Sequence, residues 1–109
     1  MESSEKIIET MLSLRNEEQT KVLSGFFKTG PGEYGEGDVF LGIKVPQTRA
    51  VVKSVWKDCS LDDIDVLMTS EYHEIRLCAV LILVQKYRHA RKDEGVRRQI
   101  VDFYLAHTE

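Results

Sequence analysis

The sequence predicts an all-α protein of about six helices arranged as antiparallel pairs. Apolar residues recur at spacings of three and four over most of the 109 residues, and no stretch alternates like a strand. The links between helical segments are short, which favours antiparallel neighbours. Two pairs of similar shape, over residues 46–69 and 71–107, indicate an αα repeat. Such repeats bury a continuous core only when they stack on neighbours.

Two helices are expected before a Gly-rich loop. Ser3 or Ser4 can cap the first and Asn16 the second, because a side-chain oxygen there accepts a hydrogen bond from the first turn. Residues 30–37, GPGEYGEG, cannot hold a helix. The apolar residues 40–43, FLGI, are expected to dock this loop onto the core.

Four helices are expected after the loop. The third has Pro46 in its first turn, where the missing N–H of proline costs nothing, and turns its valines at 51, 52 and 55 to the core. Ser60 and Asp63 stand at the spacing of a capping box and start the fourth. The fifth, residues 72–87, is apolar nearly all round, as expected of an element covered on several sides. The sixth begins near Asp93.

The composition predicts a soluble cytoplasmic domain. Hydrophobic residues make up 42% and charged residues 30% of the chain. The longest apolar run, residues 78–84, is too short for a bilayer that needs about 20 residues. The first residues lack the features of a signal peptide. The two cysteines are too few for a disulfide framework, and Cys78 is expected in the core.

Basic side chains gather in two windows although the net charge is −3. Residues 40–57 contain no acid, and residues 86–98 contain only two. The cations of these windows are Lys44, Arg49, Lys53, Lys57, Lys86, Arg88, Arg91, Lys92, Arg97 and Arg98. Phosphate binding depends on the local potential, so nucleic acid is a candidate partner. The alternative is a solvated helix surface.

Two motifs begin like catalytic or cofactor sites and fail on inspection. Residues 30–35 have the G-x-G-x-x-G spelling, but a helix precedes them and acids interrupt them, which excludes a dinucleotide site. His73 and Glu74 begin a zinc-protease motif whose second histidine is replaced by Leu77. Glu74 is instead expected to favour the start of the fifth helix. No complete catalytic constellation and no cofactor or metal site is expected.

Residues 26–46, FFKTGPGEYGEGDVFLGIKVP, resemble the N-terminal region of AlkD-type DNA alkylation repair proteins. Arg49, three positions after the proline, and residues 72–76, YHEIR, belong to the same resemblance, which covers most of the chain from about residue 20. It implies an α-solenoid of HEAT-like repeats whose basic concave face holds duplex DNA. The implied activity is that of a DNA glycosylase that excises cationic N3- and N7-alkylated purines.

The resemblance also implies that the catalytic aspartate, and a tryptophan one turn before it, follow a segment like residues 100–109. No catalytic residue is therefore expected within the chain. We expect a truncated N-terminal segment of the HEAT-like domain that is inactive alone and exposes apolar faces, which favours self-association. The alternative is a non-catalytic HEAT-like scaffold that binds DNA or protein.

Four residues are predicted to contact DNA. The resemblance places Tyr34 near the lesion, where an aromatic face attracts a cationic base; packing over Phe40 is the alternative. Lys44, Arg49 and Lys53 are expected to contact phosphates, the last two on one helix face because they are four residues apart. An ion pair within the repeat is the alternative role for Arg49.

Overall fold

The computed structural model describes residues 4–26, 39–90 and 92–107. In these ranges the backbone forms six helices: α1 (Ser4–Ser13), α2 (Glu17–Phe26), α3 (Val45–Val55), α4 (Leu61–Met68), α5 (His73–His89) and α6 (Glu94–Ala106). The described ranges hold no strand, only an isolated bridge between Val39 and Tyr72. The prediction of an all-α protein of about six helices is confirmed.

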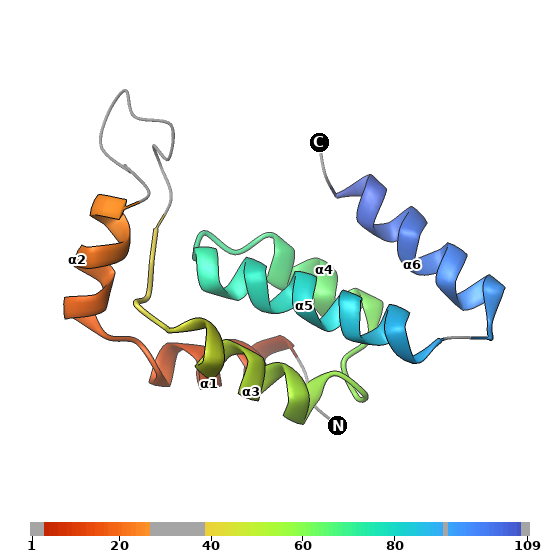
Figure 1. Ribbon diagram of the computed structural model, residues 1–109, viewed down its shortest axis with the longest axis horizontal. Helices are drawn as coiled ribbons and strands as arrows, with labels where there is room; N and C mark the ends of the chain where they lie inside the picture. The colour runs from red at the N-terminus through yellow and green to blue at the C-terminus, as the bar shows by residue number, and fades with distance from the viewer. Residues whose placement is uncertain (1–3, 27–38, 91, 108–109) are drawn as a thin grey trace.

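The central helix is α5. It packs against α1, α3, α4 and α6. Figure 1 shows α1 and α3 side by side in one layer, with α4 and α5 beside them in the next. Successive helices from α3 to α6 reverse direction, so the predicted antiparallel pairs are present. The position of α5 between four helices explains why its sequence is apolar nearly all round.

The core forms around α5, whose Ile75, Cys78, Ala79 and Ile82 are fully buried. Full burial of an Ile side chain such as Ile75 or Ile82 contributes roughly 1.5–3 kcal/mol to folding. The predicted Val51, Val52 and Val55 of α3 are buried in this core, and α1, α4 and α6 add Ile7, Met11, Ile64, Leu67 and Ile100. Only part of the apolar face of α6 is buried in the core: Ile100 is buried, while other apolar side chains of this helix are exposed.

Local capping by a side chain sets the starts of three helices, α2, α4 and α6. Ser60 Oγ accepts a hydrogen bond from the Asp63 N–H at 3.1 Å, and Asp63 Oδ2 accepts from the Ser60 N–H at 3.2 Å, which completes the predicted capping box. Asn16 Oδ1 accepts from the first turn of α2, and Asp93 Oδ1 from the first turn of α6. α1 begins at Ser4, and Ser3 lies outside the described residues.

The fifth helix runs two residues past its predicted end at Tyr87. Its last turn is basic, with Lys86, Arg88 and His89, and cations there interact favourably with the negative end of the helix dipole. In the part of the chain that the structure describes, no helix has the length and apolar character needed to cross a membrane.

Candidate nucleic-acid interface

A shallow depression of about 300 Å³ lies between α3 and α5. Its lining contains no carboxylate and consists of Arg49, Val52, Lys53, Leu81, Val84, Gln85 and Arg88. Three of these side chains are cations from two helices, and all three are exposed. Cations that converge on an apolar surface with no nearby acid form a site suited to an anionic group such as a phosphate.

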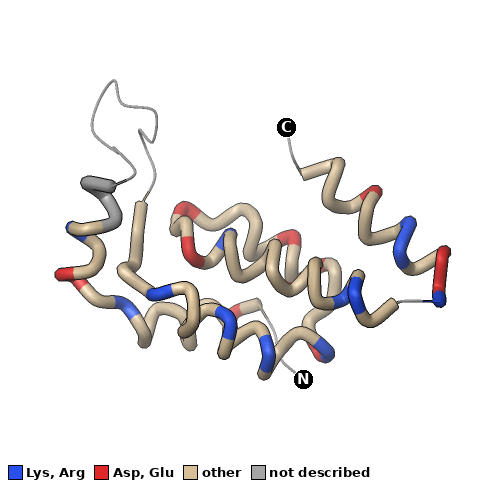
Figure 2. The backbone as a smooth tube through the Cα atoms, viewed as in Figure 1, with Lys and Arg blue, Asp and Glu red and all other residues tan. Residues whose placement is uncertain are grey.

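The helical period of α3 brings two predicted phosphate contacts to this place. Arg49 and Lys53 are one turn apart, while Val51, Val52 and Val55 face the core. Figure 2 shows basic positions recurring along α3 with no acidic position among them. Neither cation has an ion pair or a hydrogen bond within the described ranges, so the alternative role of Arg49 as an ion-pair partner finds no support.

The third cation of the depression is Arg88 from the last turn of α5. Sequence reasoning assigned it to a basic window but not to the site, because its proximity to α3 arises only when α5 packs on that helix. Lys57, which helical spacing places next in the α3 row, is absent from this lining. Its ammonium lies 5.7 Å from the centroid of the Trp56 ring, which itself lies 4.3 Å from the His89 ring. Lys57 thus makes a cation–π contact with Trp56 and does not join Arg49 and Lys53 at the depression.

The two remaining predicted contacts lie apart from the depression or outside the described residues. Lys44 is the N-cap of α3 and is exposed, and its backbone N–H donates to Gln47 Oε1 at 3.0 Å. It does not line the depression. Tyr34 and the Gly-rich residues 30–37 lie outside the described residues. The ring of Phe40, the alternative partner of Tyr34, is buried and lies 4.9 Å from the His73 ring.

A buried carboxylate holds the segment that leads into α3. Glu74 is only 2% exposed, and it accepts hydrogen bonds from the backbone N–H groups of Leu41, Gly42 and Ile43 at 2.9, 2.8 and 3.1 Å. Residues 40–43 are buried, which confirms that this apolar segment docks onto the core. The prediction that Glu74 favours the start of α5 was incomplete, because its acceptor atoms are used by a segment more than 30 residues upstream.

Gly42 is required where the segment passes α2. Its φ is +81°, a conformation that side chains with a Cβ rarely adopt. A Cβ at this position would collide with the Asn16 carbonyl oxygen and lie 2.7 Å from Thr20 Oγ1. The Asn16 N–H donates to the Leu41 carbonyl oxygen at 2.8 Å, so the segment and the start of α2 are joined directly.

The two cysteines lie in the protein core rather than at a reactive site. Burial, together with Asp63, raises the pKa of Cys59 to about 11, and burial with the neighbouring Cys59 raises that of Cys78 to about 12. Thiols with such pKa values are poor nucleophiles at neutral pH. The described residues contain no group of three His, Cys, Asp or Glu side chains that could hold a metal ion.

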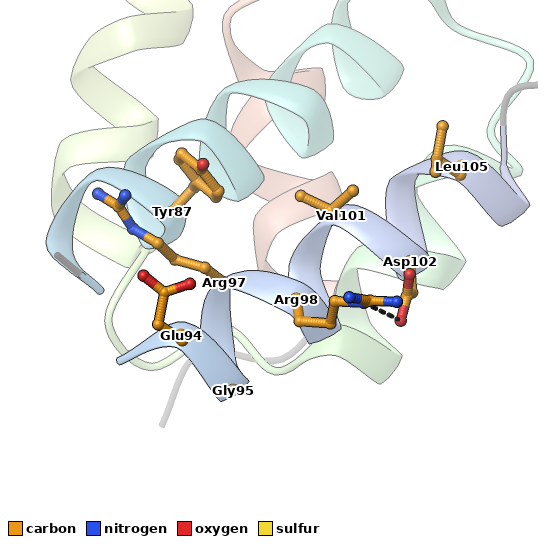
Figure 3. Close-up of a pocket in the computed structure, with 8 residues that line it drawn as sticks. All are labelled: Tyr87, Glu94, Gly95, Arg97, Arg98, Val101, Asp102 and Leu105. Carbon is orange, nitrogen blue, oxygen red and sulfur yellow. Dashed lines mark ion pairs between the residues drawn. The ribbon is translucent and has the colours of Figure 1, made fainter. Parts of the chain in front are cut away.

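A larger cavity of about 680 Å³ lies between the end of α5 and α6 (Figure 3). The Arg97 guanidinium carbon lies 4.6 Å from the centroid of the Tyr87 ring, and Arg98 Nε lies 3.9 Å from Asp102 Oδ2. Glu94 adds a second carboxylate to the lining. An anion here would meet two carboxylates, and both cations already contact neighbouring side chains. The depression between α3 and α5 is therefore the better candidate for binding an anion.

Comparisons with known proteins identify the family. No curated protein and no solved structure matches the chain. The model of the DNA alkylation repair enzyme family matches residues 7–109, which include α2 to α6, the Glu74-held segment and the cationic depression. A match over this share of the chain establishes membership, and the chain therefore belongs to the DNA alkylation repair enzyme family.

Proposed function

We propose that this chain is part of a DNA glycosylase that removes cationic N3- and N7-alkylated purines from duplex DNA. Family membership supports a role in DNA alkylation repair. The observation that carries the DNA-binding part is the depression between α3 and α5, where Arg49, Lys53 and Arg88 converge without a carboxylate.

In this proposal the three cations bind the phosphate backbone. Arg49 and Lys53 present charges about one helical turn apart, roughly 6 Å, a spacing that allows them to follow one strand. Arg88 approaches from α5, on the other side of the same depression. Such contacts do not depend on base sequence, as suits an enzyme whose target is a chemical lesion.

The chemistry needs little acid catalysis at the base. An N3- or N7-alkylated purine already carries a positive charge, so the electron pair of the C1′–N bond neutralises the departing base. The sugar is left with cationic character, which a carboxylate stabilises until water adds at C1′ and releases a proton. The resemblance assigns this carboxylate to an aspartate in a segment that follows residues like 100–109.

The activity is tested with the intact protein on duplex DNA that contains 7-methylguanine or 3-methyladenine. Release of the free base, resolved by liquid chromatography, is the expected result, and unmodified duplex is the control. If the protein binds duplex DNA and releases neither base, the glycosylase proposal fails.

A non-catalytic DNA-binding scaffold is the second candidate. The observation that favours it is that no acid lines the depression, which can therefore bind DNA without acting on it. The two candidates differ in one outcome: the scaffold binds duplex DNA with the same salt dependence and leaves every glycosidic bond intact.

A further inference from the structure

We propose that Glu74 is a positioning residue for DNA binding. Its carboxylate holds residues 39–43 in place, and this segment sets where α3 begins and hence how Arg49 and Lys53 are presented. The inference rests on the proposed function, since it assigns to Glu74 the placement of the phosphate-binding cations.

The carboxylate provides the acceptors that a buried irregular segment requires. Leu41, Gly42 and Ile43 lie in no helix or strand, so their backbone N–H groups have no regular partner, and an unpaired buried N–H is costly. Glu74 Oε1 accepts from Leu41, and Oε2 accepts from the next two residues. Because Glu74 is the second residue of α5, the positive end of the helix dipole also favours its negative charge there.

The segment that Glu74 holds connects three helix starts. Its first carbonyl, that of Val39, accepts from the N–H of His73 at the start of α5. Its middle carbonyl, that of Leu41, accepts from the N–H of Asn16 at the cap of α2. Ile43 is followed at once by Lys44, the N-cap of α3. A shift of this segment therefore moves the first turn of α3 relative to α5, and with it the distance from Arg49 to Arg88.

A glutamine at position 74 tests the acceptor role with nearly the same side-chain shape. Its NH₂ group would face backbone N–H donors in either amide orientation, so Leu41, or both Gly42 and Ile43, would lose the acceptor of their N–H. We expect Glu74→Gln in the intact protein to weaken duplex binding at least tenfold. The slope of log affinity against log salt should fall by about one unit or more, because each lost phosphate contact removes about 0.9.

The salt slope separates positioning from stability. A side chain that only stabilises the fold would lower the melting temperature, while the protein that remains folded would keep the wild-type slope. The matched control is Glu71→Gln, which removes the same charge from an exposed residue just before α5 and should leave the slope unchanged. An unchanged slope in Glu74→Gln, or an equal change in both variants, would overturn the proposal.

Two further measurements test the proposal if the Glu74→Gln protein does not fold. Glu74→Asp keeps the charge and shortens the side chain, and it should give an intermediate slope. In the wild-type protein, hydrogen exchange should be slow at the amides of Leu41, Gly42 and Ile43; exchange as fast as at exposed amides would overturn the proposal. If the wild-type protein binds no duplex DNA, the proposed function fails as well; if it binds and Glu74→Gln keeps its slope, only the assignment to Glu74 fails.

Discussion

His107, the residue that follows α6, is hydrogen-bonded to Asp65 of α4, 42 positions earlier in the chain. The distance from His107 Nε2 to Asp65 Oδ1 is 2.6 Å, and Nδ1 of the same ring lies 2.7 Å from the Phe103 carbonyl oxygen. Both ring nitrogens face acceptors, so the ring is best satisfied when both carry a proton. The hydrogen bond to Asp65 is the main cause that raises the pKa of His107 above its usual 6.5.

This pair makes the attachment of α6 pH-dependent. A folded-state pKa above the unfolded value means that the stabilisation is fully present below about pH 6.5 and is lost as the pH rises through the raised value. Relative to Asp65→Asn, the wild-type protein should therefore gain most stability near pH 5 to 6.5 and least above the raised pKa. An NMR titration should show the His107 pKa falling toward 6.5 in Asp65→Asn; identical titrations would contradict the assignment.

Removing the two cations of α3 should weaken binding to duplex DNA by the same factor whether or not the duplex contains an alkylated base. In the intact protein, Arg49→Ala with Lys53→Ala should reduce the slope of log affinity against log salt by about two units, and adding Arg88→Ala should remove about one more. Arg98→Gln, whose side chain is paired with Asp102 on α6, is the control and should change the slope little. If the slope is constant and the melting temperature drops, Arg49 stabilises the repeat and the phosphate assignment is wrong.

Gly42→Ala should destabilise the protein by at least about 2 kcal/mol, because the added Cβ meets α2 and the positive φ is unfavourable for alanine. Gly95→Ala is a matched control. At position 95, in the first turn of α6, the nearest atom to an added Cβ is Asp93 Oδ1 at 3.4 Å. That substitution should be neutral or stabilise by up to about 1 kcal/mol. Urea unfolding of both variants measures the difference, and equal effects would contradict the close approach at Gly42.

Cys59 and Cys78 should resist alkylation in the folded protein. Their pKa values of about 11 and 12 leave almost no thiolate at pH 8, and both side chains are buried. Iodoacetamide at pH 8 should therefore add no mass within an hour to the native protein and two adducts after unfolding in urea. Rapid labelling without denaturant would show that one of the thiols is accessible.

The 1–109 chain should self-associate through α5 and α6. These helices leave an apolar groove that contains Val84, Val101 and Tyr104, each about 40% exposed or more. Burial of such a surface is favourable at about 25 cal/mol per Å². Light scattering should show dimers at high concentration, and Val101→Lys should restore the monomer. A chain that stays monomeric at millimolar concentration would contradict this expectation.

The sequence by itself determined the helices and their caps. The capping box of Ser60 and Asp63 and the cap at Asn16 act within three residues, so their spacing reveals them. The apolar circumference of α5 likewise indicated a helix covered on several sides, because burial on each face must be matched by apolar side chains on that face. The docking of residues 40–43 could also be predicted, since four residues with three large apolar side chains are unfavourable in water.

Only the tertiary structure decided which distant groups meet. From the sequence, Glu74 is expected only to favour the start of α5 through the helix dipole. In the structure its carboxylate oxygens accept hydrogen bonds from backbone N–H groups 31 to 33 residues upstream. Arg88 joins Arg49 and Lys53 only because α5 packs beside α3. His107 meets Asp65 of α4 only because α6 packs on α5 and brings its C-terminal end within reach of α4. Such partners depend on the relative placement of rigid helices. That placement is set by the whole core at once, and no local spacing in the sequence encodes it.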